Sequence, residues 1–153
     1  MTIEIKEGYS RLEDIRSLFG EYTASLGIDL TYQNYAQELA DLPGKYARPD
    51  GILYLALVNQ TPAGCIAMRR FDAQTCEMKR LYVRDAFRGH RLGEQLVQTV
   101  INQARAIGYS RLVLDTLADM DSALRLYKKL GFIKTHAYYD TPIKETVFMS
   151  LTL

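Results

Sequence analysis

The chain has 153 residues, of which 48% are hydrophobic and 24% charged, as in one globular domain with a single core. Nineteen basic and eighteen acidic residues leave a formal net charge of +1, which excludes a general electrostatic field for nucleic acid or anionic lipid. The first residues, MTIEIKEGY, lack the apolar run of a signal peptide, and no run of about 18 apolar residues suggests a membrane span. We therefore expect a cytoplasmic protein without a membrane or nucleic-acid partner.

The first half of the chain predicts two helices followed by a sheet. A short strand over 2–6 precedes a helix over 11–26, in which apolar residues recur every three or four positions and which Gly27 ends. A weaker helix is predicted over 31–41, with Thr31 as its cap. After a loop rich in Pro and Gly, an antiparallel meander is predicted from three strand-like segments, 52–59, 64–71 and 76–83.

Helical and strand-like patterns alternate in the second half. The predicted elements are a helix over 91–107, a strand over 110–115, a helix over 120–130, a strand over 132–138 and a closing segment over 144–153. A strand, helix, strand unit after a meander requires a parallel pair joined by a crossover. We therefore predict a single α/β domain, 1–153, with a mixed, mainly antiparallel central sheet and helices on both faces. Cys65 and Cys76 flank a predicted hairpin and are expected to be reduced core residues.

The stretch RDAFRGHRLGEQLVQ, residues 84–98, joins a predicted strand directly to a predicted helix. Residues 86–91 include no Ser, Thr, Asp or Asn to cap the first helical amides, so an anion is a candidate partner for them. Positive charge for phosphate oxygens would come from Arg84, Arg88, His90 and Arg91. A solvated basic turn is the alternative, because neither GxxxxGK[ST] nor GxGxxG is present.

Four segments in order, EMKRLYV, RGHRLG, RLVLDT and ALRLYKKLGF, give the chain a family resemblance. They resemble the GNAT superfamily of acyl-CoA-dependent N-acetyltransferases, whose loop pattern is [RQ]xxGx[GA]. RGHRLG fits this pattern at Arg88 and Gly93 but has Arg91 where the family usually has Gly. The resemblance covers nearly the whole chain and is strongest over 76–133.

The resemblance implies acetyl-CoA as cosubstrate and no metal or redox cofactor. The backbone amides of the loop would bind the pyrophosphate, and the backbone of the preceding strand would bind the pantetheine arm. The implied residues are Arg88, Gly89, His90, Arg91, Leu92, Gly93 and Glu94 in the loop, and Leu81, Tyr82 and Val83 in the strand. Ser122 is a weaker candidate, replacing an Asn that many members carry after LDT, while Asp119 or Asp121 is expected to cap the next helix.

Acetyl transfer to an amine requires a base, a polarised carbonyl and an acid. An alkyl amine with a pKa of about 10 is mostly protonated at pH 7, so a base, or a water chain leading to one, helps to produce the nucleophile. Glu77 is the candidate base, and the alternative is a carboxylate that faces solvent or pairs with Lys79 or Arg80. Tyr127 is the implied acid for the coenzyme thiolate, although its helical spacing also fits a core aromatic. A backbone amide near 81–83 would polarise the carbonyl.

The acceptor side of the site is the least specified by the sequence. Tyr22, Tyr138 and Tyr139 are polar aromatics suited to a pocket or to the core. The resemblance to small members that acetylate a free amino acid or another small amine predicts the primary amine of a small molecule, such as an amino acid, as acceptor. A protein or peptide N-acetyltransferase and a noncatalytic acyl-CoA-binding module are the alternatives, and a homodimer remains open.

Overall fold

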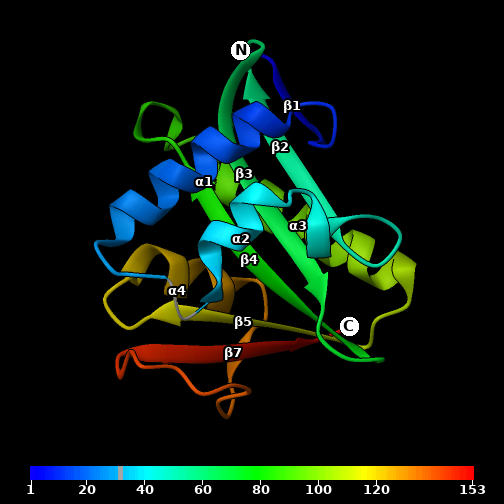
Figure 1. Ribbon diagram of the computed structural model, residues 1–153, viewed down its shortest axis with the longest axis vertical. Helices are drawn as coiled ribbons and strands as arrows, with labels where there is room; N and C mark the ends of the chain where they lie inside the picture. Colours follow the sequence, from blue (N-terminus) through cyan, green and yellow to red (C-terminus); the bar gives the residue numbers. More distant parts are fainter. Residues whose placement is uncertain (31–32) are drawn as a thin grey trace.

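Seven strands form one sheet in the computed structural model, which describes residues 1–30 and 33–153 (Figure 1). In sheet order they are β1 (Ile3–Glu7), β2 (Ile52–Val58), β3 (Thr61–Arg70), β4 (Thr75–Val83), β5 (Arg111–Leu117), β7 (Thr146–Thr152) and β6 (Ile133–Lys134). The β4–β5 pair is parallel and each other pair of described neighbours is antiparallel. The predicted mixed, mainly antiparallel sheet is thereby confirmed.

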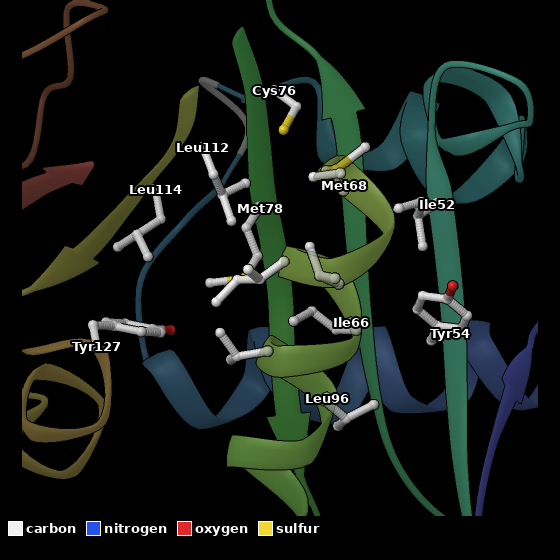
Figure 2. Close-up of a cluster of buried hydrophobic side chains, with 14 of the residues drawn as sticks. Ile52, Tyr54, Ile66, Met68, Cys76, Met78, Leu96, Leu112, Leu114 and Tyr127 are labelled. Atoms are coloured by element: carbon white, nitrogen blue, oxygen red, sulfur yellow. The ribbon is translucent and has the colours of Figure 1, made fainter. Parts of the chain in front are cut away.

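Helices cover both faces of this sheet, as predicted (Figure 1). They are α1 (Leu12–Leu26), α2 (Tyr35–Ala40), α3 (Leu92–Ile107) and α4 (Asp121–Lys129), with short 3₁₀ turns at Gly44–Tyr46 and Asp85–Phe87. Alternate residues of β2 point to opposite sides, so this wholly apolar strand is buried on both faces. Leu53 and Leu55 pack with α1, whereas Ile52 and Tyr54 pack with α3 (Figure 2).

Several local predictions can be compared directly with the structure. Gly27, with φ of 66°, ends α1 as predicted, and Cys65 and Cys76 are both free and buried. α2 starts at Tyr35, while the predicted cap Thr31 lies outside the described residues. No helix in the described part of the chain is long and apolar enough to cross a lipid bilayer.

Two predictions for the last third of the chain were wrong. The strand expected over 132–138 is only Ile133–Lys134, because the chain then turns so that Tyr138 bonds to β4. Neither Asp119 nor Asp121 caps α4: Met120 precedes the helix and makes no side-chain cap, and Asp121 is already the first helical residue. At that position its charge still favours the positive end of the helix dipole.

The central feature for function is the separation of β4 from β5. The two strands pair only from Thr75 opposite Arg111 to Glu77 opposite Val113, and then diverge. Figure 1 shows them close at one end and apart at the other. Beyond this point β5 continues against β7 and β4 against β3, so the facing edge of β4 has no strand partner among the described residues.

A β-bulge shapes β4 in its separated half. Lys79 pairs with Ala67 and Tyr82 pairs with Cys65, so two residues of β4 lie opposite one residue of β3. Arg80, the first of the two, has a φ of 63°, which is uncommon for a residue with a side chain. A bulge of this kind bends the strand and increases its local twist.

Candidate active site

A cavity lies between the separated halves of β4 and β5. Its volume is about 80 Å³, and it opens to solvent on one side. Its walls come from α1 and the segment after it, from β4 and β5, and from α4. The lining residues that bear on chemistry are Tyr22, Lys79, Arg80, Leu81, Asp115 and Tyr127.

The start of α3 has the free amides that the sequence predicts. Arg91 precedes the helix in the left-handed region, with φ of 58°, and no side chain caps it. Among the described residues, the amides of 89–94 find no backbone acceptor, whereas Gln95 already donates to the carbonyl of Arg91. This end of a 16-residue helix therefore presents a row of donors and the positive pole of the helix dipole.

The side chains around this turn differ in exposure and in the groups they contact. Arg88, His90 and Arg91 are exposed, while Leu92 is buried in the core and Glu94 pairs with Lys129 of α4 at 2.8 Å. Gly93 faces α4, because a Cβ there would lie 3.6 Å from the Leu126 side chain.

Arg84 does not join the basic turn. Its guanidinium donates to both carboxylate oxygens of Glu21 on α1, at 2.9 and 2.7 Å, and to the carbonyl of Pro62. The expectation that it would add charge for phosphate was wrong, because a nearer carboxylate from another part of the chain engages it.

The predicted strand residues lie along the separated edge of β4. Leu81 lines the cavity, and Tyr82 and Val83 continue the strand beyond the bulge, all three half-buried. The Tyr82 ring packs edge-on against Tyr22 of α1. This backbone therefore borders the gap between the two strands, where an extended ligand could pair with it.

Tyr127 reaches the cavity from α4. Its side chain is 6% exposed and belongs to the core between the sheet and α3, and its hydroxyl is directed toward β4 (Figure 2). Burial raises the pKa of Tyr127 above its ordinary value of 10, and nearby Tyr22 and Asp115 raise it further. The core and the acid interpretations are compatible, because the ring packs in the core while Tyr127 also lines the cavity.

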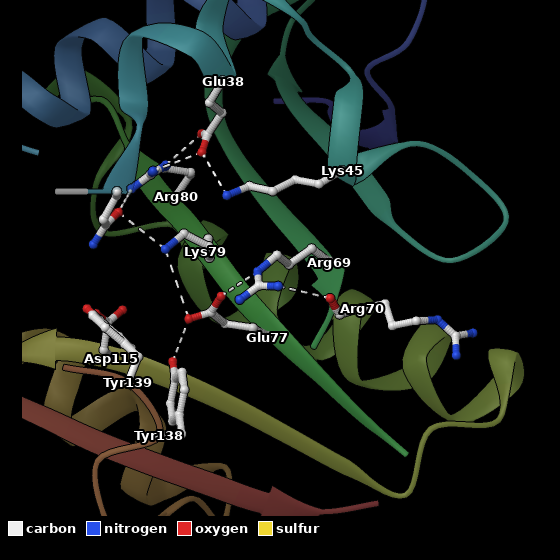
Figure 3. Close-up of polar contacts among 11 residues, drawn as sticks. Glu38, Lys45, Arg69, Arg70, Glu77, Lys79, Arg80, Asp115, Tyr138 and Tyr139 are labelled. Atoms are coloured by element: carbon white, nitrogen blue, oxygen red, sulfur yellow. Dashed lines mark hydrogen bonds and ion pairs between the residues drawn. The ribbon is translucent and has the colours of Figure 1, made fainter. Parts of the chain in front are cut away.

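Glu77 is buried within a polar network rather than exposed (Figure 3). Arg69 donates to its Oε1 at 2.8 Å and the Tyr138 hydroxyl to its Oε2 at 2.6 Å, while the Lys79 ammonium lies 4.0 Å away. Burial alone would raise the pKa of Glu77, but Lys79, Tyr138 and Arg69 together hold it below its ordinary value. Glu77 does not itself line the cavity, and Lys79 lies between them.

The same network continues from Lys79 to α2 (Figure 3). Lys79 and Arg80 both donate to Oε1 of Gln33, at 3.2 and 2.9 Å. Arg80 also forms a two-pronged pair with Glu38, at 2.9 and 3.0 Å, and both side chains are less than 5% exposed. Arg80 thus has a carboxylate partner held by two hydrogen bonds, whereas the carboxylate nearest to Lys79, that of Glu77, lies 4.0 Å away.

Sequence reasoning missed two charged residues of the cavity wall, Lys79 and Asp115. Lys79 appeared only as a partner for Glu77, and Asp115 only as the end of a strand. Both lie on strands in which several consecutive residues are buried, so the sequence does not tell which face of the strand lines the cavity.

The remaining predicted residues are distributed around the site. Tyr22 lines the cavity, as proposed for the acceptor side. Tyr138 and Tyr139 stand behind it: the Tyr138 hydroxyl donates to Glu77 and the Tyr139 hydroxyl donates to Oδ2 of Asp115. Ser122 is exposed in the first turn of α4, with Arg125 as its neighbour at 3.5 Å, and does not line the cavity.

Comparison with known proteins gives consistent matches. Residues 12–132 match the model of the acetyltransferase (GNAT) family. An uncharacterized N-acetyltransferase of Schizosaccharomyces pombe is 44% identical over 93% of this chain and 88% of its own. The N-acetylaspartate synthetase of Danio rerio is 33% identical over 72% of this chain and 41% of its own. The crystal structure of an acetyltransferase from Streptococcus agalactiae superposes with a TM-score of 0.79, at 26% identity over 99% of this chain and 98% of its own.

Proposed function

Because this chain belongs to the acetyltransferase (GNAT) family and is an acetyl-CoA-dependent N-acetyltransferase, we propose that its acceptor is the primary amine of a small molecule. The observation that carries the proposal is the cavity between β4 and β5, which brings a protonated tyrosine, a strand edge without a partner and charged side chains together. The amine attacks the thioester carbonyl directly, and the coenzyme leaves as its thiol.

The loop and the strand edge provide the coenzyme site. The free amides of 89–94 and the dipole of α3 bind the pyrophosphate, and each such contact with an anion contributes about 0.3 to 1 kcal/mol. The exposed side chains of Arg88 and Arg91 add positive charge there. The backbone of 81–83 pairs with the pantetheine arm, and Ser122 remains a peripheral candidate for a coenzyme contact.

The thioester carbonyl is polarised at the bulge of β4. A backbone amide near Leu81 donates to the oxygen as negative charge develops on it, a contribution of about 2.7 to 4 kcal/mol in comparable sites. Tyr127, held protonated by burial, then gives its proton to the departing thiolate.

The amine loses a proton before or during attack. We propose that Glu77 is the ultimate base and that a water chain connects it to the amine, because its carboxylate is ionised but lies behind the cavity wall. A pH profile of Glu77→Gln parallel to that of the wild type would reduce Glu77 to a structural role.

A thiol-release assay with acetyl-CoA tests the proposed function. The acceptors are free amino acids, polyamines, aminoglycosides and short peptides, each at millimolar concentration. We expect turnover of at least one small-molecule amine, with the N-acetylated product identified by mass spectrometry. Turnover of peptides alone would favour a peptide N-acetyltransferase, and coenzyme binding without any turnover would favour an acyl-CoA-binding module. We also propose a cytoplasmic location, which two free, buried cysteines fit.

A further inference from the structure

We propose that the acceptor carries a carboxylate beside its primary amine, as an amino acid does, and that the Lys79 ammonium binds this carboxylate. The inference rests on the proposed function and adds to it a chemical class of acceptor and a residue that recognises it. Three observations carry it, namely the few hydrogen bonds of the buried Lys79 ammonium, the pairing of its charged neighbours, and the carboxylate of Asp115 on the opposite wall of the cavity.

Lys79 is a buried cation that makes fewer hydrogen bonds than its ammonium group can donate. Its side chain is 7% exposed, and an ammonium has three hydrogens to donate. Among the described residues it donates one hydrogen bond, to Gln33 at 3.2 Å. The 4.0 Å to Oε2 of Glu77 is too long for a hydrogen bond. A buried charge is costly unless it is paired and hydrogen-bonded, so the ammonium can still accept an anionic partner from the cavity that it lines.

The neighbouring charges already have partners. Arg80 is paired with Glu38 through two hydrogen bonds, and Glu38 also contacts Lys45 at 3.2 Å. Both carboxylate oxygens of Glu77 are occupied by Arg69 and Tyr138. The network on this face of the sheet holds the cations Lys45, Arg69, Lys79 and Arg80 and the carboxylates Glu38, Glu77 and Asp115 (Figure 3). Cations outnumber carboxylates by one in this network.

Asp115 gives the cavity a second, opposite charge. It lies on β5, across the gap from Lys79 on β4, and both residues line the cavity. Its Oδ2 accepts from the Tyr139 hydroxyl, whereas Oδ1 has no hydrogen-bond partner in the described part of the chain. A cation on one wall and a carboxylate on the other match the two charges of an amino acid. In the proposed complex, the amino group of the acceptor faces Oδ1 of Asp115, and the carboxylate of the acceptor faces the ammonium of Lys79.

Polycationic acceptors do not fit this arrangement. Polyamines and aminoglycosides would bring further positive charge toward Lys79, and they carry no anionic group to pair with its ammonium. An acceptor without a carboxylate would leave the buried Lys79 ammonium without an anionic ligand in the complex. A site built to bind a charged group rejects analogues that lack that group for this reason.

The test compares matched acceptors in the wild-type enzyme. The twenty common L-amino acids are screened with acetyl-CoA, and the best acceptor is compared with its carboxamide and with its decarboxylated amine. We expect kcat/KM for the acid to exceed that for each analogue by about 10- to 100-fold. Similar values for acid, amide and amine would overturn the inference while leaving the proposed function intact.

Variants then assign the preference to Lys79. In Lys79→Met the ratio of kcat/KM for the acid to kcat/KM for the carboxamide should fall to about one, because KM for the acid rises. KM for acetyl-CoA should stay unchanged. Lys79→Arg keeps a positive charge and should restore part of the ratio. Lys134→Met, which removes an exposed ammonium on β6, should keep the wild-type ratio. A wild-type ratio in Lys79→Met would overturn the assignment. If that variant does not fold, the Lys79→Arg ratio and the wild-type comparison decide.

No turnover of any amine by a protein that binds acetyl-CoA would remove the proposed function and this inference together. Turnover restricted to amines or peptides that lack a neighbouring carboxylate would remove the inference alone. The screen of acceptors therefore distinguishes failure of the proposed function from failure of this inference alone.

Discussion

Tyr127 shows how one residue can belong to the core and also line the cavity. Its ring packs among the apolar residues between the sheet and α3, while its hydroxyl ends at the cavity. In the described part of the chain, no hydrogen bond to that hydroxyl contributes to its pKa. Helical spacing alone cannot separate these roles, because both place the ring on the same face of α4.

For Tyr127→Phe we expect kcat to fall by about 100-fold or more, because the proton donor for the thiolate is lost. KM for acetyl-CoA and the thermal stability should change little, since the ring and its packing remain. Steady-state kinetics and thermal melting check this. The matched control is Tyr109→Phe, which removes a hydroxyl that donates to the Asp50 carbonyl at 2.8 Å outside the cavity. It should cost about 1 kcal/mol of stability and leave turnover intact, and unchanged kcat in Tyr127→Phe would exclude it as the acid.

At the scale of elements, the site depends on how β4 and α3 end and begin. The bulge at Arg80 displaces the end of β4, and Arg91 opens α3 in a left-handed conformation that costs a residue with a side chain about 1 kcal/mol or more. Gly64 on β3 allows the bulge, because a Cβ there would lie 2.6 Å from the carbonyl oxygen of Tyr82.

Gly64→Ala should therefore disturb the coenzyme edge of β4. The added methyl group must push the Tyr82 carbonyl away, which we expect to cost about 1 to 3 kcal/mol of stability and to raise KM for acetyl-CoA. Urea denaturation and kinetics measure both. Gly20→Ala is the control, because a Cβ at this position in α1 meets nothing within 4 Å and should stabilise the helix by about 0.5 to 1 kcal/mol. A Gly64→Ala enzyme with wild-type KM would show that the bulge does not position the coenzyme.

At the scale of the whole molecule, a buried ion pair joins α2 to the centre of the sheet. Glu38 on α2 and Arg80 on β4 are 42 residues apart in the chain and bond twice. Burial alone would raise the pKa of Glu38, but the hydrogen bonds and charge of Arg80, with Lys45, hold it below the ordinary 4.5. A carboxyl group with a lowered pKa in the folded state stabilises the fold above pH 4.5, and this stability is lost as the pH falls through the folded value.

Glu38→Gln should reveal this contribution. We expect the variant to be less stable than the wild type by about 3 kcal/mol at pH 7, because Arg80 is left buried without its carboxylate. The difference should shrink as the pH falls below 4.5, where the wild type also loses the charge of Glu38. Urea unfolding between pH 3 and 7 measures it, with the exposed Glu4→Gln as control. A difference that does not depend on pH would contradict the ion-pair account.

The sequence alone determined most of the elements and the uncapped helix start, and its family resemblance supplied the candidate acid. These features depend on local periodicity, on the residues beside a helix end and on short motifs, all of which lie within a few positions of one another. The expected strand over 132–138 failed for the opposite reason, since the contact of Tyr138 with Glu77 spans 61 residues.

Only the tertiary structure decided which charges face the reaction. Glu77 was the predicted base from its position early in a strand, yet its partners from β3 and from the segment before β7 place it behind Lys79. Lys79 and Asp115 become cavity residues because β4 and β5 stop pairing after three residues and separate. The physical reason is that the cost or use of a charge depends on burial and on neighbours brought in by the fold, neither of which is present in local sequence.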